Sequence, residues 1–331
     1  EQFECLACCG GWPHLEMAPS LLILCLAVWP ASSAVLQLGF CAYNEDVRNP
    51  PPWPAVVAVT RKSFESADPI VVLPGTSNFT VNWHLAYAES SGDSVKEGIN
   101  RMLGQRLEGV THLPSQIVVG CGGSSTSLKV TPVGASLRIP LISWWAGAPE
   151  LSNKLEFPYF LRTRGTSAGN GAAVVLIAQS FQWRAIGFIY EEDAFHIGAF
   201  EGATQKSREL GVQITGTRLA HFPNMIESDA DEWSEGLKDA ADSGLRVFGY
   251  SVMGPASKNR FFLQSARRAS LNNTVLIAAL ELQDFFVSHD AELRSSWNGM
   301  LGVDYSQDGK TPESQRFESE WRKMDFEQMR G

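Results

Sequence analysis

The stretch from Gln116 to Ser143 reads QIVVGCGGSSTSLKVTPVGASLRIPLIS. Its opening residues 116–120 are a short apolar run, the pattern of a strand buried on both faces of a parallel sheet. Residues 124–137 then predict a helix, and residues 139–143 predict the next strand. A strand, a helix and a strand in close succession indicate a βαβ unit.

The same alternation extends in both directions along the chain. We expect strands at residues 35–43, 79–87, 185–190, 212–219, 247–250 and 274–280, and an extended segment at 157–163. Helices are expected at residues 94–107, 172–181, 195–210, 231–242 and 256–269, and a flexible Gly-rich turn at 165–171. Two such series predict an α/β protein with two lobes, each a parallel sheet flanked by helices.

Composition limits the classes of protein that fit. The 331 residues, 44% of them hydrophobic, suffice for about two domains with real cores. The net charge of -9 argues against a partner made of nucleic acid, because such proteins present basic surfaces to phosphates. No apolar run reaches the roughly 18–20 residues of a membrane-spanning helix, so we expect any anchor to lie outside this sequence.

The first 34 residues resemble a processing segment. After Met17 comes an apolar run from Leu21 to Trp29, followed by small residues up to Ala34. This order predicts a secretory signal cleaved after Ala34, preceded by an upstream extension. A buried helix or strand is the alternative.

Cleavage there would leave only two of the six cysteines, Cys41 and Cys121. They form a disulfide or remain two buried thiols, and the sequence does not decide between them. Asn78 and Asn272 each begin an N-x-[ST] tripeptide and are candidate glycosylation sites on a secreted chain.

The Gly-rich loop 120–127 is the strongest candidate binding element. Its glycines allow a ligand to approach the backbone, Ser124 and Ser125 offer hydroxyls, and the following helix start suits an anion. An ordinary capped turn is the alternative. The loop lacks the third glycine of a dinucleotide fingerprint and the Lys of a P-loop, so a nucleotide-dependent enzyme is the least favoured hypothesis.

Catalytic and metal-binding patterns find little support. None of the six histidines stands at metal-ligand spacing, and we expect no metal, no cofactor and no enzymatic activity. The triplet 191–193, Glu-Glu-Asp, is either a paired-carboxylate site or a solvated acidic loop. Trp145 and Phe195 are either walls of a ligand site or core residues. Ligands of open parallel sheets bind beyond the carboxyl ends of strands, which adds the positions after Ser143, Tyr190 and Tyr250.

Several strings, taken together with the Gly-Ser loop, carry a family resemblance. They are IPLIS at 139–143, APELSN at 148–153, FPYFLR at 157–162, FQWRAI at 181–186 and ATQKSREL at 203–210. In this order they resemble the extracellular ligand-binding region of class C G-protein-coupled receptors, with metabotropic glutamate and GABA type B receptors nearest in pattern. The resemblance is strongest over residues 116–210.

The resemblance implies a type I periplasmic-binding-protein (Venus-flytrap) fold. Its lobes would be residues 35–162 and 163–297, with 298–331 returning to an incomplete lobe one. A small amino-acid-like or carboxylate ligand would sit between the lobes, and their closure would be the signal. It also implies an extracellular location, a homo- or heterodimer through lobe one, and G-protein coupling through a membrane region beyond residue 331. The sensor region of a receptor guanylate cyclase and a soluble solute-binding protein are the alternatives.

The family's binding positions fall on several residues of this chain. The Ser that binds the ligand carboxylate corresponds to Ser124, with Ser125 beside it, and the next segment is Trp145, Ala146 and Gly147, which has no hydroxyl. Where the family carries an acidic residue for the ligand amine this chain has Ser167, and where glutamate-type receptors carry a Tyr it has Phe195. Tyr250 completes the set from topology. These departures fit an anion with an apolar body, a changed ligand or a lobe that has lost binding. Cys41 and Cys121 would end neighbouring strands of lobe one, which makes their pairing feasible.

Overall fold

The computed structural model describes residues 35–43, 80–88, 91–104, 106–107, 110–111, 114–121, 123–222, 226, 228–252, 256–271, 274–279, 300–303, 315 and 319. These residues form two five-stranded sheets and a two-stranded ladder, β3 (Arg106–Leu107) with β4 (Val110–Thr111). The α/β class and the parallel sheets predicted from the sequence are confirmed.

The first sheet has the order β2-β1-β5-β6-β7, and all its pairs are parallel. Its strands are β1 (Val35–Tyr43), β2 (Thr80–Ala88), β5 (Ile117–Gly120), β6 (Leu141–Ser143) and β7 (Phe160–Arg162). Its helices are α3 (Ser91–Leu103) and α4 (Ser124–Leu137), with a short 3₁₀ turn at Pro149–Ser152. All four residues of β5 are buried, as its apolar run predicts.

The second sheet has the order β12-β11-β10-β8-β9, again parallel throughout. Its strands are β8 (Ala185–Glu191), β9 (Gln213–Leu219), β10 (Val247–Ser251), β11 (Val275–Ala278) and β12 (Leu301–Gly302). Its helices are α5 (Ser167–Ser180), α6 (Ala194–Leu210), α7 (Asp229–Asp242) and α8 (Ala256–Arg268). Counted in chain order within each sheet, both sheets have the strand order 2-1-3-4-5, which is a doubly wound topology.

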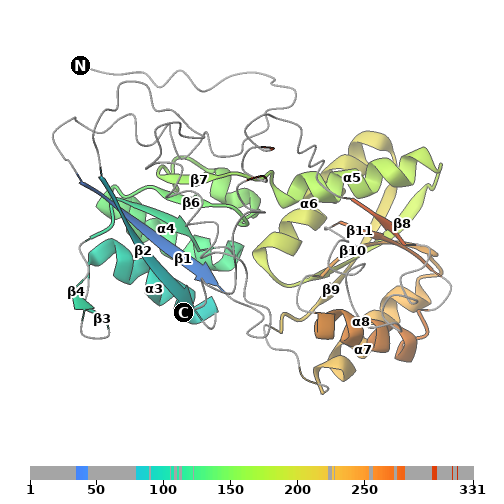
Figure 1. The fold of residues 1–331 in the computed structure, drawn as a ribbon. Helices are drawn as coiled ribbons and strands as arrows, with labels where there is room; N and C mark the ends of the chain where they lie inside the picture. Colours follow the sequence, from blue (N-terminus) through green and yellow to red (C-terminus); the bar gives the residue numbers. More distant parts are fainter. Residues whose placement is uncertain are drawn as a thin grey trace.

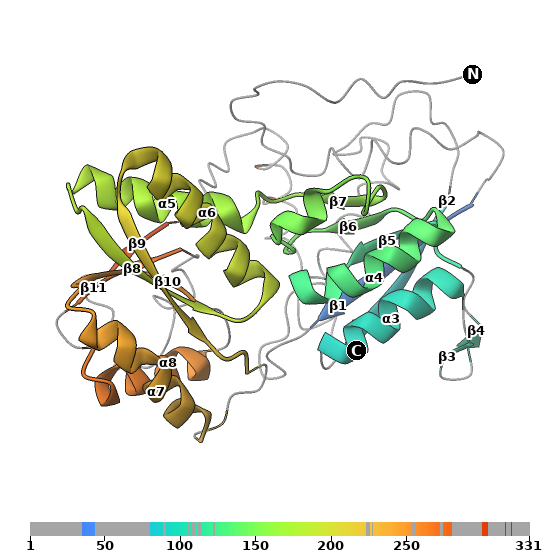
Figure 2. The same ribbon diagram turned by 180° about the vertical axis from the view of Figure 1, so that it is seen from behind.

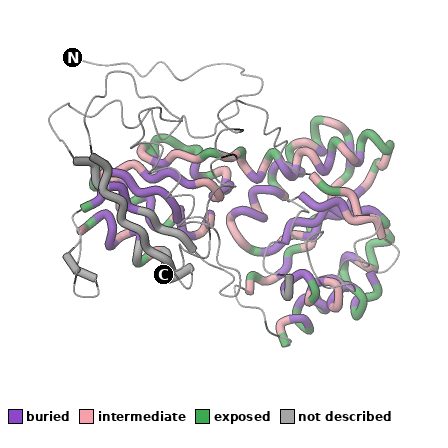
Figure 3. Tube along the Cα trace, in the orientation of Figure 1, coloured by how far each residue is buried: buried purple, intermediate pink, exposed green. Residues whose placement is uncertain are grey.

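Helices pack against each sheet (Figure 1). In the second sheet, α5 and α6 lie on one face and α7 and α8 on the other, and the view from behind agrees (Figure 2). The two faces contain separate core clusters, one around Val174, Phe188 and Ala203, and one around Trp233 and Phe262. Buried residues accordingly follow the strands and the inner helix faces (Figure 3).

Two of the boundaries that differ from the sequence prediction are explained by glycines. The helix expected at 94–107 is α3, which ends at Leu103 because Gly104 adopts a left-handed φ of +68° and the β3–β4 ladder follows. The Gly-rich segment 165–171 is not a flexible turn from end to end, since α5 begins at Ser167. An added Cβ at Gly171 would lie 1.7 Å from the carbonyl oxygen of Ala199, so this glycine allows α5 and α6 to touch.

No helix within the described residues is long and apolar enough to cross a membrane. The chain passes from the first sheet to the second through the residues between β7 and α5, and the two sheets lie side by side (Figures 1 and 2).

Candidate functional site

The carboxyl ends of strands from both sheets meet at one junction. In a sheet of order 2-1-3-4-5, the connections that leave the first and third strands run to opposite faces, and ligands bind in the crevice between them. These strands are β1 and β5 in the first sheet and β8 and β10 in the second. The helix start after β5 carries Ser125, and the loop after β8 carries Asp193.

Ser125 and Asp193 join these two loops directly. The Ser125 hydroxyl donates a hydrogen bond to Asp193 Oδ2. The other oxygen of the carboxylate, Oδ1, accepts from the backbone N–H of Phe195 at 2.9 Å and so caps the first turn of α6. We call the first sheet with its helices the first half and the second sheet with its helices the second half. One carboxylate therefore connects the start of α4 in the first half to the start of α6 in the second.

Hydrogen bonds of Ser124 link the segment after β6 to the start of α4. Its Oγ accepts the backbone N–H groups of Gly147 at 3.1 Å and Ala148 at 3.0 Å. The carbonyl oxygen of Gly147 in turn accepts the backbone N–H of Ser167 at 2.8 Å. Gly147 thus lies between the starts of α4 and α5.

The junction is closely packed where two glycines stand. An added Cβ at Gly147 would lie 2.5 Å from Cε2 of Phe195, and one at Gly198 would lie 2.3 Å from Cδ of Pro149. Phe195 is only 1% exposed. The first turns of α6 therefore press against residues 147–149 with no room for larger side chains.

An arginine lies across the same junction. The guanidinium carbon of Arg164 is 4.5 Å from the ring centroid of Trp145 and 5.1 Å from that of Phe195. Its Nη1 donates to the Trp145 carbonyl at 3.4 Å. Arg164 comes from the crossover between β7 and α5, so a cation on that connection contacts an aromatic ring from each half.

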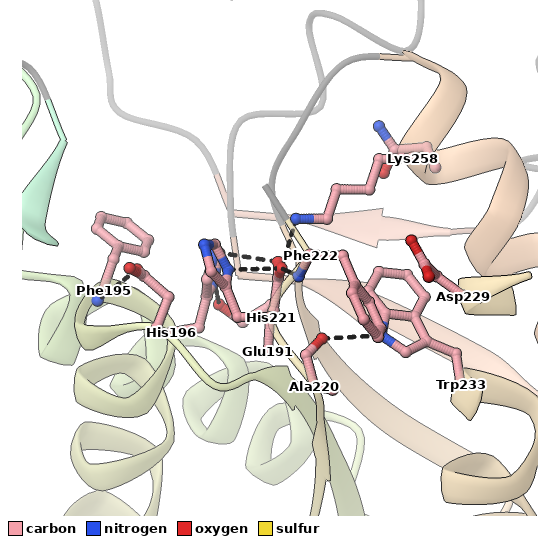
Figure 4. Close-up of polar contacts among 12 residues, drawn as sticks. Glu191, Phe195, His196, Ala220, His221, Phe222, Asp229, Trp233 and Lys258 are labelled. Atoms are coloured by element: carbon pink, nitrogen blue, oxygen red, sulfur yellow. Dashed lines mark hydrogen bonds and ion pairs between the residues drawn. The ribbon is translucent and has the colours of Figure 1, made fainter. Parts of the chain in front are cut away.

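Two residues before Asp193 in the chain, Glu191 forms a buried ionic cluster in the second half (Figure 4). Glu191 is 0% exposed, and its Oε1 accepts from Lys258, from His221 Nδ1 at 2.7 Å and from the N–H of Phe222 at 3.2 Å. His196 places Nε2 3.9 Å from Oε2 of Glu191, while its Nδ1 lies 2.9 Å from the hydroxyl of Ser251. Within the described part of the chain, Oε2 has no hydrogen-bond partner.

These contacts set the charges of the cluster. Burial alone would raise the pKa of Glu191, but the hydrogen bond from His221 and the charge of Lys258 hold that pKa below its usual value. The pKa of Asp193 is likewise lowered, since its hydrogen bonds from Ser125 and the Phe195 N–H are among the effects that outweigh burial. Burial lowers the pKa of His196 to about 4 although both carboxylates oppose the shift, so His196 is neutral at pH 7.

The structure brings most of the sequence-predicted positions together. Ser124, Ser125, Gly147, Ser167 and Phe195 make the contacts above, and Trp145 joins them through Arg164.

Two further predicted positions are buried. Ala146 is 0% exposed beside the junction. Tyr250 is buried away from the junction. Its ring packs on Phe262 and its hydroxyl donates to Asn259 Oδ1 at 2.9 Å, in the core beneath α7 and α8.

Other functional-looking residues were missed or misjudged from the sequence. The acidic triplet is not a solvated loop, because only Glu192 is exposed, where it pairs with Arg218 at 3.3 Å. Its position directly after the predicted strand 185–190 was the available signal for Glu191, which in the structure is the last residue of β8. Arg164 and Lys258 carried no pattern of their own. No group of three or more His, Cys, Asp or Glu side chains among the described residues could hold a metal ion.

The secretion-related predictions fall mostly outside the described residues. Asn78, Asn272 and the signal segment belong to that part of the chain. The backbone of Cys41 lies in register with Gly120 on the neighbouring strand, and Cys121 follows directly and is buried. The pairing of the two cysteines stays a prediction.

Comparison with known families fits this architecture. The model of the receptor family ligand binding region matches residues 73–329. The chain belongs to this family. As a member of the receptor ligand-binding family, it also shares sequence with named class C receptors, and the resemblance predicted from the sequence is confirmed.

Three relatives illustrate the range of sequence identity and of matched length. Metabotropic glutamate receptor 4 of Rattus norvegicus is 28% identical over 153 residues, 46% of this chain and 16% of the relative. The extracellular calcium-sensing receptor of Homo sapiens is 30% identical over 122 residues, 37% of this chain and 11% of the receptor. Metabotropic glutamate receptor 8 of Homo sapiens is 31% identical over 94 residues, 28% and 10% respectively. The matched regions thus span a small part of each relative, and these relatives are receptors rather than enzymes.

Proposed function

We propose that this chain is the extracellular ligand-sensing region of a membrane receptor. It binds a small amino-acid-like or carboxylate ligand between its two halves and signals by their closure. G-protein coupling through a membrane region, and dimerisation through the first half, belong to the same proposal. The hydrogen bond from Ser125 to Asp193 carries it, because this bond joins the switch-point loops of the two sheets.

The physical basis is a population shift. A ligand that contacts both halves only when they are closed stabilises the closed state by its differential affinity for the two states. The chain itself makes contacts at the place where such a ligand would act, since Ser125 with Asp193 and Gly147 with Phe195 each pair a residue of one half with a residue of the other.

The hydrogen bonds of Ser124 give a further reason to propose a carboxylate ligand at the start of α4. Its Oγ already accepts two backbone N–H groups, and these polarise its own O–H bond. A ligand carboxylate receiving that hydrogen would be held at the start of α4, where the helix dipole favours negative charge.

A ligand screen combined with solution scattering tests the proposal. The chain would be mixed with the natural amino acids and with simple carboxylic acids, and its melting temperature and radius of gyration measured. We expect at least one compound to raise the melting temperature and decrease the radius of gyration. If no compound does either, the sensor function is wrong.

Ser124→Ala locates the site. Loss of a hydrogen bond to a charged ligand corresponds to about a tenfold or larger loss of affinity. Ser136→Ala is the matched control, because that serine lies exposed on the same helix and bonds only locally, to the Pro132 carbonyl at 3.0 Å. Equal ligand affinity in both variants would place the ligand elsewhere.

A further inference from the structure

The start of α4 has no capping side chain within its own helix. Its N-cap residue is Gly123, which offers no side-chain hydrogen bond, and its first turn contains no acidic residue. A helix start carries a partial positive charge and is stabilised by a nearby anion. The sequence predicts a ligand carboxylate at this position, beside Ser124 and Ser125.

In the structure, a carboxylate of the chain itself lies at this helix start. The Ser125 hydroxyl, in the first turn of α4, donates to Asp193 Oδ2. Asp193 belongs to the second half, where its Oδ1 accepts the N–H of Phe195 at 2.9 Å and caps α6. One anion thus serves the starts of two helices, one from each half.

Asp193 is positioned by bonds within the second half, independently of Ser125. Its N–H donates to the Glu191 carbonyl at 2.8 Å, and its own carbonyl accepts the N–H of Ile197 at 2.9 Å. Burial would raise the pKa of Asp193, but its hydrogen bonds are among the effects that hold that pKa below its usual value. The acceptor is therefore ionised at neutral pH, and a hydrogen bond to an ionised acceptor is stronger than one to a neutral acceptor.

Side chains of the two halves also pack closely around this bond. The Phe195 ring lies against Gly147 and Pro149 lies against Gly198, with no space for a Cβ at either glycine. Apolar contact and a charged hydrogen bond thus act at the same junction. The hydrogen bond depends on a single oxygen atom of Ser125, so one substitution removes it and leaves the packed residues in place.

We propose that Asp193 takes the place of a ligand carboxylate at Ser125 and holds the two halves closed before a ligand binds. This inference rests on the proposed function in that it concerns the same closure, which a ligand would complete. The Ser125–Asp193 bond would set the fraction of closed molecules in the unliganded chain. A ligand that requires the closed state then binds more tightly, because its apparent affinity scales with that fraction.

Two variants separate this role of Asp193 from its role as a helix cap. Ser125→Ala removes the bond between the halves and leaves the cap of α6 untouched, and Ala is a better helix former than Ser. Asp193→Asn keeps an oxygen for the Phe195 N–H but removes the charge. The matched controls are Ser136→Ala, exposed on α4, and Asp242→Asn, exposed at the end of α7.

Hydrogen exchange followed by mass spectrometry measures the opening of the junction. The purified chain is dialysed first, and circular dichroism checks that each variant is folded. The informative peptides contain residues 145–149 of the first half and 194–198 of the second, which pack on each other. Peptides of α7 and α8 are the internal reference, because these helices lie on the other face of the second sheet from α6 (Figure 1).

We expect Ser125→Ala to speed exchange in both junction peptides about tenfold or more, as loss of a hydrogen bond to a charged group implies. The reference peptides should keep their rates, and the two controls should change nothing. Asp193→Asn should have a smaller effect of the same sign, because a neutral amide oxygen still accepts the Ser125 hydroxyl. In the Asp193→Asn chain, Ser125→Ala should therefore have less effect than in the unchanged chain.

Three results would overturn the inference. They are unchanged exchange of the junction peptides in Ser125→Ala, equal acceleration of the reference peptides, and full additivity of Ser125→Ala with Asp193→Asn. Each of them leaves the sensor function standing, since that function is tested by the ligand screen above. Faster exchange confined to the junction, together with a negative ligand screen, would support the role of Asp193 and refute the sensor function.

Discussion

Removing Lys258 should destabilise the second half strongly. Glu191 is 0% exposed and Lys258 3% exposed, and the two form a direct ion pair. Lys258→Met keeps much of the side-chain volume but leaves the carboxylate with His221 and the Phe222 N–H as its hydrogen-bond donors among the described residues. Breaking a buried pair by removing one partner typically costs about 3–5 kcal/mol.

Urea unfolding of the purified chain measures this loss. With a denaturant slope of about 2 kcal/mol/M, the transition of the second half should move down by roughly 2 M. Lys238→Met is the matched control, because Lys238 pairs with Glu235 on the surface of α7, with side chains 54% and 72% exposed. Such a pair contributes less than about 1 kcal/mol.

A double variant identifies the cause. Glu191→Gln combined with Lys258→Met removes both charges, so part of the lost stability should return. The reasoning fails if Lys258→Met costs no more than Lys238→Met, or if the double variant is less stable than Lys258→Met alone.

Three further changes have expected outcomes. Gly171→Ala should destabilise the chain by more than about 1 kcal/mol in urea unfolding, because the added Cβ would meet the backbone of α6. Gly169→Ala is the control and should be neutral or slightly stabilising, since no atom lies within 4 Å of its added Cβ. Equal effects of the two variants would contradict the close packing of α5 on α6. Gly147→Ala should lower the free energy of unfolding by about 1–3 kcal/mol through its clash with Phe195. Adding Phe195→Leu to this variant should restore part of the lost stability. A neutral effect of Gly147→Ala would show that the junction is less closely packed than described. The pKa of His196 is about 4 in the folded state and 6.5 in the unfolded state, so between these pH values the unfolded state binds the extra proton. The free energy of unfolding should therefore fall by roughly 3 kcal/mol as the pH drops from 6.5 towards 4. His196→Gln should flatten this pH dependence, and an unchanged pH dependence would refute the reasoning.

Much of the fold was predictable because its signals are local. Apolar runs such as residues 117–120 and the glycine at 211, which ends α6 with a φ of 70°, determine elements from nearby residues alone. The start of α5 was not predictable in this way. Gly169 and Gly171 resemble a turn in sequence, and the close approach of α6 that explains Gly171 involves residues some thirty positions away.

The residues of the candidate site likewise divide into those with a local sequence signal and those without one. Ser124 and Ser125 stood out because a Gly-rich loop precedes a helix, a pattern within one segment. Their partners did not stand out, since the bond to Asp193 joins residues 68 positions apart and the bond from Lys258 to Glu191 joins residues 67 positions apart. Long-range pairs of charged groups leave no periodic pattern, and a buried Glu is rare enough that exposure is the default expectation.

The contact of α5 with α6 bears on how a signal would travel. Because backbone meets backbone at Gly171 and Gly202, neither helix can slide without moving the other. α6 begins next to Asp193 and continues for 17 residues, a length of about 25 Å. A small tilt imposed at its Asp193 end would become a larger displacement at its far end, at Leu210. The paired helices would thus act as a rigid lever whose output lies on the outer surface of the second half.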